Sequence, residues 1–376
     1  MRQSKQERFI SSLFFKAYSI ADGLPVGKED SNFMPSHSTH STNSEFPKED
    51  LMTMQSHTTT FSIRHFRESD FPALGAFYNQ TAEGRRVTFW WVGEPENWAN
   101  VYCAFEGDKM IAKGQVDVFS IMPAAADPSN KHRIFFNLKT LPERESDTEL
   151  VGAMYEKLKA RALEIRTNLP NTHGTLLGFG NYVEEAANTD YFASRPEFFP
   201  LKRQYRMCHE FAEKPSPNEG QQAETTDAAA AFPLPEGYTW REFDALNNEQ
   251  ADEYLALDME IWPATPIGAE RLAEIVSRPG WRMLQAYDSE GKPAASLMYW
   301  VSDGETGEIE EVLTRAAHRR RGLASALLTR ALHEIRNLGC EEAELDVEVR
   351  NEDALKVYHA AGFEVVTEEH RYAEEL

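Results

Sequence analysis

The sequence predicts an α/β protein with two domains in tandem, and three observations support this prediction. Short segments with the period of a strand alternate with longer segments of helical period over residues 61–212 and again over 237–376. Residues 213–236, which lie between them, are rich in proline, alanine and acidic side chains, as linkers are. Each of the two segments has the length of an ordinary single domain.

The two segments repeat one order of predicted elements. Each begins with a short strand and an amphipathic helix, continues with a hairpin and a strand leading into a long helix, and ends with strands around a shorter helix. In the first segment we expect strands at 61–67, 99–105, 110–119 and 133–138, and helices at 70–78 and 150–165. In the second we expect strands at 238–243, 282–287, 293–301 and 308–314, and helices at 248–257 and 324–338, the latter ended by Gly339.

Composition restricts the possible partners. A net charge of −22 argues against a general nucleic-acid binder, and no apolar run approaches the length of a membrane span. The three cysteines have neither disulfide-framework nor zinc-site spacing, which favours a reducing compartment. Residues 1–60 have the polar, aperiodic composition of a disordered tail. We expect a cytoplasmic protein without a metal and without nucleic-acid or membrane partners; no oligomeric state is predicted.

The most informative segment lies where the strand ending at Val312, Leu313 and Thr314 leads into a helix. It consists of Arg319, Arg320, Arg321, Gly322, Leu323 and Ala324. Backbone N–H groups at a helix start attract anions, and a glycine there lets a phosphate approach the chain. The arginines add positive charge beside it. The segment therefore predicts a phosphate-bearing ligand.

A second motif follows at a fixed separation. It consists of Asn351, Ala354, Tyr358, Gly362 and Phe363. With both motifs, the sequence from about 237 to 376 resembles the GCN5-related N-acetyltransferases. This resemblance implies a central mixed sheet flanked by helices in each tandem domain, with acetyl-CoA as the acyl donor.

The resemblance also implies roles for individual residues. The backbone of residues 319–324 would hold the pyrophosphate, and Val312, Leu313 and Thr314 would pair with the pantetheine arm. Tyr358 would donate a proton to the departing thiolate, with a core tyrosine as the alternative. Asn351 is included in the coenzyme site, although its position before two acids also predicts a helix N-cap.

The base that removes a proton from the acceptor amine is expected among the carboxylates of strand 308–314. Glu308 and Glu310 share one face by the two-residue period, and Glu311 is expected on the other. Glu308 matches the position of the base in some members of the family, while Glu310 lies nearer the thioester. A water molecule as the base is the alternative. Asp258, Glu260 and Trp262 follow the first helix, where the family builds its acceptor pocket.

The first segment departs from both motifs. Its corresponding loop, residues 142–149, holds four acids and no glycine, and residues 190–198 lack the glycine before the phenylalanine. Because carboxylates repel a diphosphate, we expect this segment, 61–212, to be a related domain that has lost coenzyme binding. The tandem arrangement resembles mycothiol-synthase-like acetyltransferases.

We therefore expect an N-acetyltransferase that moves an acetyl group from acetyl-CoA to a primary amine of a small molecule by direct attack in a ternary complex. Near the motifs only Cys340 is a cysteine, which does not favour an acyl-enzyme. Two alternatives stay open: a non-catalytic acyl-CoA sensor or interaction module, and a protein N-terminal or lysine acetyltransferase.

Overall fold

The computed structural model describes residues 61–376 except 125, 212–230, 245–246 and 303. The predicted tail at 1–60 and most of the predicted linker at 213–236 lie outside the described residues. In the described part of the chain, no helix combines the length and the apolar character that a membrane span needs.

The described residues form one large mixed sheet with helices packed against it. The strands of the first half are β1 (Ser62–His65), β2 (Val101–Glu106), β3 (Lys109–Ser120), β4 (Lys131–Thr140), β5 (Gly174–Tyr182) and β6 (Phe199–Glu210). The strands of the second half are β7 (Thr239–Glu242), β8 (Arg282–Tyr287), β9 (Pro293–Ser302), β10 (Thr306–Thr314), β11 (Glu342–Glu348) and β12 (Glu364–Glu375). The α-helices are α2 (Phe71–Thr81), α3 (Thr148–Arg166), α4 (Ala186–Ala193), α6 (Asn248–Ile261), α7 (Gly268–Val276), α8 (Leu323–Asn337) and α9 (Glu352–Ala360).

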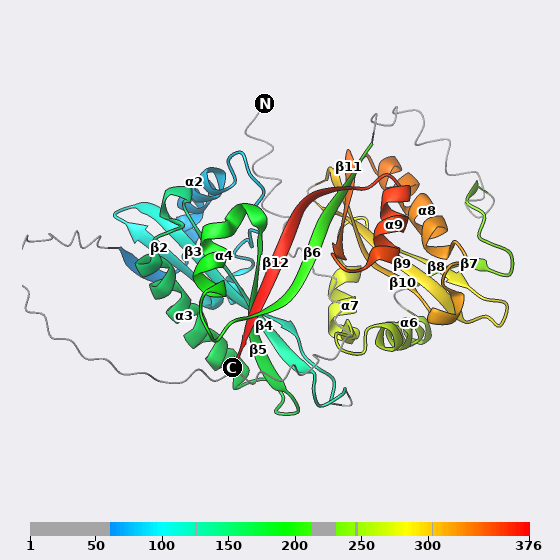
Figure 1. Ribbon diagram of the computed structural model, residues 1–376, viewed down its shortest axis with the longest axis horizontal. Helices are drawn as coiled ribbons and strands as arrows, with labels where there is room; N and C mark the ends of the chain where they lie inside the picture. The colour runs from blue at the N-terminus through cyan, green and yellow to red at the C-terminus, as the bar shows by residue number, and fades with distance from the viewer. Residues whose placement is uncertain (1–60, 125, 212–230, 245–246, 303) are drawn as a thin grey trace, which may run out of the picture.

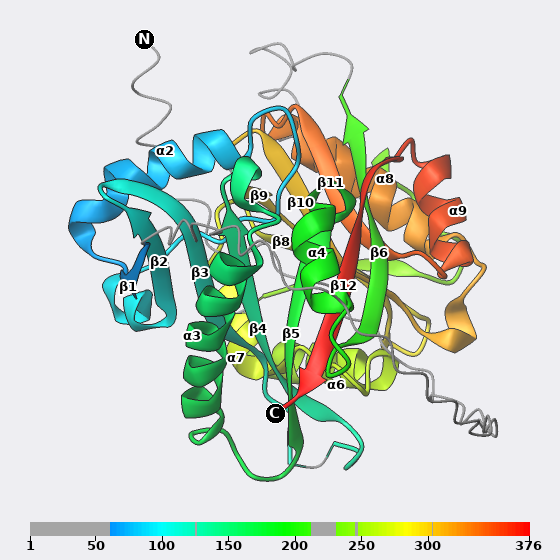
Figure 2. The same ribbon diagram turned by 60° about the vertical axis from the view of Figure 1, so that its left-hand side comes forward.

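The strand order reveals an exchange between the two halves. The order is β1-β2-β3-β4-β5-β12-β6-β11-β10-β9-β8-β7, so the last strand of each half lies in the sheet of the other. Strand β12 pairs antiparallel with β5, while β6 pairs antiparallel with both β12 and β11. Figures 1 and 2 show the red β12 and the green β6 running together between the two halves. Because of this exchange, a division of the chain into two residue ranges does not describe which strands lie together in the sheet. The predicted boundaries 61–212 and 237–376 stay predictions.

Each half contains one parallel strand pair that separates along its length. In the first half β4 pairs with β5 as far as Phe135 and Gly178, and in the second β10 pairs with β11 as far as Ile309 and Leu345. Beyond these points the strands diverge and their backbone groups need other partners. The two diverging pairs are equivalent places in the two halves.

The helix after the predicted phosphate loop forms as its periodicity predicts. Five apolar side chains of α8 are buried: Leu323, Leu327, Leu328, Ala331 and Ile335. Gly339 has a φ of +90°, which ends the helix in the left-handed region. Gly307 lets α8 approach β10, because a Cβ there would lie 2.2 Å from Ile335 Cγ2. Helix α7 was not predicted from the sequence, although Leu272 and Ile275 have helical spacing and are both buried.

Candidate active site

A cavity of about 550 Å³ opens between β10, the start of α8 and α9. It is lined by Ile261, Trp262, Val312, Thr314, His318, Arg319, Arg320, Gly322, Leu323, Ala324, Ser325, Asn351, Asp353, Ala354, Val357 and Tyr358. These residues include most of the predicted coenzyme site and members of both sequence motifs, although Leu313, Arg321, Gly362 and Phe363 are not among them. The structure therefore brings the two motifs together around one space.

The loop before α8 has the backbone geometry of an anion site. Arg320 has a φ of +60° and Gly322 a φ of +84°, both in the left-handed region, and Gly322 is the N-cap of α8. Such alternation turns successive N–H groups toward one side, where the positive end of the helix adds to their field. Arg319 lines the cavity and its Nε donates to the Thr314 carbonyl oxygen over 3.1 Å. Arg321 is exposed and lies outside the cavity lining.

A bulge in β10 changes the faces that the sequence predicts. The register between β10 and β9 shifts between Glu310 and Leu313, and Glu311 has a φ of +49°. As a result, Val312 and Thr314 line the large cavity, whereas the side chain of Leu313 is buried in the core. Glu311 was expected on the face opposite Glu310, but both residues line one small cavity. The extra residue of the bulge is the reason, because it breaks the two-residue alternation.

This second cavity, of about 70 Å³, adjoins the first. The two share Trp262, Val312, Asn351, Ala354 and Tyr358. The remaining residues of its lining are Lys202, Ile309, Glu310, Glu311, Leu345, Asp346, Val347 and Glu348. Four of the thirteen residues that line it carry carboxyl groups and one is a lysine, so the small cavity is more acidic than the larger one.

Glu308, a predicted candidate for the base, is held in a buried ion cluster. Arg206 Nη2 lies 2.5 Å from Glu308 Oε2 and 2.6 Å from Glu344 Oε2, and its Nη1 lies 3.3 Å from Asp346 Oδ2. Ser302 Oγ also donates to Glu308 Oε1 over 3.2 Å. Arg206 belongs to β6, so the exchanged strand supplies this cation. Glu308 is therefore engaged with protein groups and does not line either cavity described here.

Glu310 has a different environment. Its exposed fraction is 8%, and no ion pair or side-chain hydrogen bond ties it to another residue in the described part of the chain. Burial raises its pKa to about 8, although the positive charge of Arg278 acts in the opposite direction. Burial, together with the charge of Asp258, also raises the pKa of Glu311 well above its usual range. A carboxyl group with a pKa near neutrality can accept a proton effectively.

The second motif places Tyr358 between the two cavities. Asn351 forms the predicted N-cap of α9, its Oδ1 accepting from the Ala354 N–H over 3.2 Å. Tyr358, two turns further, is 8% exposed and lines both cavities. Burial, and next the charge of Glu311, raise the pKa of Tyr358 above its usual value, so the hydroxyl keeps its proton. Tyr358 therefore carries a protonated hydroxyl group at the boundary between the cavities.

The residues expected in the acceptor pocket separate in the structure. Trp262 lines both cavities, and Asp258 is buried with Oδ2 accepting from the Ile267 N–H over 2.7 Å. Glu260 instead pairs with Arg315 at 3.0 Å on the surface. Sequence reasoning did not find Arg206 or Lys202, because both lie on β6 in the first half and reach this site only through the strand exchange.

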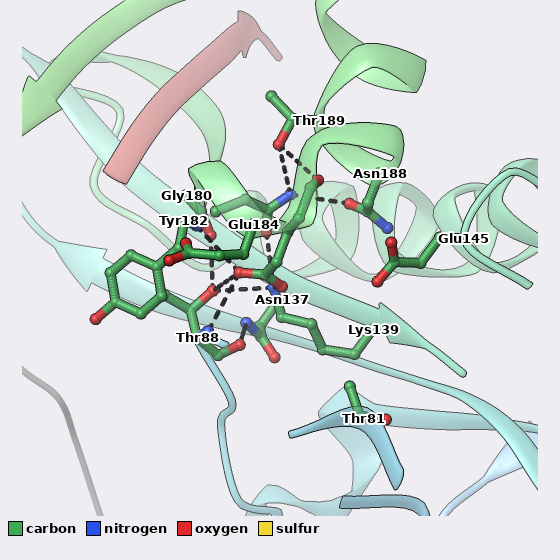
Figure 3. Close-up of polar contacts among 12 residues, drawn as sticks. Thr81, Thr88, Asn137, Lys139, Glu145, Gly180, Tyr182, Glu184, Asn188 and Thr189 are labelled. Atoms are coloured by element: carbon green, nitrogen blue, oxygen red, sulfur yellow. Dashed lines mark hydrogen bonds and ion pairs between the residues drawn. The ribbon is translucent and has the colours of Figure 1, made fainter. Parts of the chain in front are cut away.

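The equivalent place in the first half is occupied by the protein itself. Lys139, beyond the point where β4 and β5 diverge, is buried and its Nζ contacts Glu185 Oε1, Asn181 Oδ1 at 2.7 Å and Thr88 Oγ1 at 2.9 Å. Thr88 is also held through its carbonyl oxygen, which accepts from Asn137 Nδ2 over 2.8 Å. Figure 3 shows Thr88, Asn137 and Lys139 within this network. The segment carrying Thr88 therefore fills the space between the diverging strands.

Comparisons with known proteins agree with this arrangement. Residues 243–363 match the family model described as acetyltransferase (GNAT) family. Over 153 residues the chain is 33% identical to a mycothiol acetyltransferase of Beutenbergia cavernae, an alignment covering 39% of this chain and 51% of that protein. The chain thus matches about half the length of this curated relative.

Two solved structures resemble the whole fold. A GCN5-related N-acetyltransferase from Sphaerobacter thermophilus superposes with a TM-score of 0.59 at 18% identity, covering 84% of this chain and 95% of the other. A tandem GNAT protein from the clavulanic acid biosynthesis pathway superposes with a TM-score of 0.52 at 15% identity, covering 84% and 98%. These similarities confirm the predicted fold class of two tandem domains.

Proposed function

We propose, from the premise that residues 243–363 match the family model described as acetyltransferase (GNAT) family, that the protein is an N-acetyltransferase that transfers an acetyl group from acetyl-CoA to a primary amine of a small molecule. The observation that carries the proposal is the junction of the two cavities. The bulged strand and Tyr358 line both cavities there, the loop before α8 lines the larger cavity, and the unpaired carboxyl group of Glu310 lines the smaller one. A mere binding site for acyl-CoA would not need the protonated tyrosine and the unpaired carboxyl group.

The larger cavity would hold the donor. The N–H groups of residues 319–324 and the start of α8 would bind its pyrophosphate, with Arg319 and Arg320 adding charge. The bulge frees backbone groups near Val312, which can pair with the pantetheine arm and polarise the thioester carbonyl. Asn351 would contribute to the coenzyme site by stabilising the start of α9, since its side chain caps that helix. The predicted role of Arg321 in coenzyme binding has the weakest support, because Arg321 is exposed and does not line the cavity.

The chemical step would run in a ternary complex. The amine nitrogen attacks the thioester carbonyl carbon, forming the C–N bond while the oxyanion is held by backbone N–H groups. The C–S bond then breaks and the thiolate takes the proton of the Tyr358 hydroxyl. Glu310, ionised, accepts the proton lost by the amine; solvent later takes this proton from Glu310 and returns one to Tyr358. We favour Glu310 over Glu308 as the base because the carboxyl group of Glu308 is already paired with Arg206.

The first half would bind no coenzyme. The equivalent space between β4 and β5 holds the Thr88 segment and the buried Lys139 network. We therefore expect one acetyl-CoA per chain. Titration calorimetry with acetyl-CoA measures this directly, and a stoichiometry of two would contradict the assignment.

The deciding experiment follows thiol release from acetyl-CoA with a panel of small amines and peptides. Release with small amines, accompanied by an acetylated product in mass spectrometry, is the expected result. Coenzyme binding without release for any acceptor would favour the sensor alternative. Faster turnover of peptides than of small amines would favour a protein acetyltransferase.

A further inference from the structure

His318 lies directly before the loop of residues 319–324, and the proposed mechanism gives it no role. It ends a short 3₁₀ helix, Ala316–His318, and lines the larger cavity. Its side chain is 18% exposed, so other groups enclose most of it. Because the imidazole lies beside the loop that would bind the pyrophosphate, both its contacts and its charge act on that loop.

Both ring nitrogens of His318 face groups from other parts of the second half. Nδ1 lies 2.8 Å from Tyr238 Oη, and the two rings meet edge to face with their centroids 5.7 Å apart. Nε2 lies 3.6 Å from Asp288 Oδ2, in the turn between β8 and β9. Asp288 is itself fixed, because its Oδ1 accepts from the N–H groups of Glu290 and Lys292, each over 2.9 Å. His318 therefore connects the start of the loop to a hairpin and to the segment before β7.

That segment, residues 231–238, also touches the loop at a second place. Pro235 Cγ lies 3.7 Å from the position that a Cβ of Gly322 would take. The Tyr238 N–H donates to the Pro235 carbonyl oxygen over 3.2 Å, so the two contacts belong to one turn. The loop that would hold the pyrophosphate is therefore supported by the end of the connection between the two halves.

Either protonation state of His318 can keep its two contacts. In the neutral ring with the proton on Nε2, Nδ1 accepts from the Tyr238 hydroxyl group, whereas the imidazolium donates from both nitrogens. The imidazolium adds one positive charge next to the loop, and Asp288 favours it as the opposite charge. An added positive charge strengthens the binding of a diphosphate.

Several charged or titratable groups surround this ring or line the same cavity: Tyr238, Asp288, Lys292, Arg319, Arg320 and Asp353. The hydrogen bond from the Lys292 backbone N–H holds the pKa of Asp288 below its usual range, so Asp288 stays ionised above about pH 5. Since Asp288 keeps its charge, protonation of His318 raises the net charge beside the loop by one unit.

From these contacts we propose that His318 is a positioning residue, which holds the coenzyme loop against the segment 231–238 and, when protonated, strengthens the binding of the coenzyme diphosphate. This inference rests on the proposed function, because it assumes that the larger cavity binds acetyl-CoA. One positive charge added beside a partly exposed anion site changes the dissociation constant by about fivefold. The effect should weaken as the salt concentration rises.

Calorimetry with dephospho-coenzyme A tests the effect of protonation. This probe keeps the diphosphate but lacks the 3′-phosphate, which itself changes charge at about pH 6. The wild-type protein should bind it about fivefold more tightly at about pH 5.5 than at about pH 8. Equal affinities at the two pH values overturn the inference and leave the proposed function intact. If acetyl-CoA binds at neither pH, the proposed function itself is overturned.

Two variants assign the pH dependence to His318. His318→Gln keeps a polar side chain that does not titrate, so its affinity for dephospho-coenzyme A should be the same at both pH values. His333→Gln is the matched control, because His333 contacts Phe232 of the same segment but is exposed on α8, outside the cavity lining; it should keep the wild-type pH dependence. A pH dependence that persists in folded His318→Gln overturns the inference.

A third variant tests the partner charge. Asp288→Asn removes the charge that favours the imidazolium, while its Oδ1 can still accept from the N–H groups of Glu290 and Lys292. Because loss of a neighbouring negative charge lowers the pKa of an imidazole, the midpoint of the pH dependence should move to lower pH. Thermal melting checks that each variant folds. If His318→Gln does not fold, Asp288→Asn decides the matter, and an unchanged midpoint overturns the inference.

Discussion

The pH dependence of turnover gives the sharpest test of Glu310 as the base. Burial raises its pKa from 4.5 to about 8. At pH 7 only about one molecule in eleven then carries the ionised base, and at pH 9 about ten in eleven do. Because the carboxylate is the reactive form, kcat/KM should rise about tenfold between pH 7 and pH 9.

The acceptor amine also loses a proton in this range, so the assay must separate the two titrations. The profile is measured by thiol release with two acceptors whose amine pKa values differ. The part of the profile that belongs to Glu310 keeps its midpoint near pH 8, while the part that belongs to the amine moves with the acceptor. In Glu310→Gln the first part should disappear and kcat/KM should fall by about a hundredfold or more.

Two further variants test the direction in which neighbouring charges shift the pKa of Glu310, and with it the midpoint of the pH profile. Arg278→Met removes a positive charge that stabilises the ionised Glu310, so the midpoint should move to higher pH. Glu308→Gln removes a negative charge that raises the pKa of Glu310, so the midpoint should move to lower pH while the rise persists. A rise near pH 8 that survives in Glu310→Gln, or vanishes in Glu308→Gln, would refute the assignment.

Three other predictions concern the loop, the tyrosine and the buried cluster. Gly322→Glu should weaken acetyl-CoA binding at least about a hundredfold by calorimetry, because it puts a carboxylate at the cavity lining; Gly291→Glu, with a similar φ of +77° in a remote hairpin, should bear the same backbone strain and keep the affinity. Tyr358→Phe should lower kcat about a hundredfold with little change in coenzyme affinity, and a normal rate at every pH would make Tyr358 a purely structural residue. Arg206→Met should destabilise the fold by about 3–5 kcal/mol in urea denaturation, since it leaves Glu308 buried without its cation and removes one of the two arginines that pair with Glu344; a loss under about 1 kcal/mol would contradict the assignment of this cluster as a buried ion network that stabilises the fold.

Local features of the site could be predicted from the sequence. The start of α8 at the phosphate loop, the N-cap at Asn351 and the helix stop at Gly339 all depend on neighbouring residues alone. Each was expected from its local pattern, and each is present.

Features that depend on distant residues could not be predicted. The bulge at Glu311 makes the face assignment predicted from the two-residue period wrong, because one extra residue moves every later side chain to the opposite face. Whether Glu308 or Glu310 is free depends on Arg206, which lies about a hundred positions earlier in the chain on a strand of the other half. No local sequence pattern around β10 indicates that Arg206 pairs with Glu308.

The strand exchange has a consequence for how this chain can be divided. Cutting the backbone between β6 and β7 would yield two fragments, each holding the closing strand that its partner requires. Expressed alone, residues 237–376 would lack β6, leaving β11 with an open edge and Glu308 without Arg206. The fragments should therefore recover activity only when they fold together, as an obligate complementation pair rather than as separable modules.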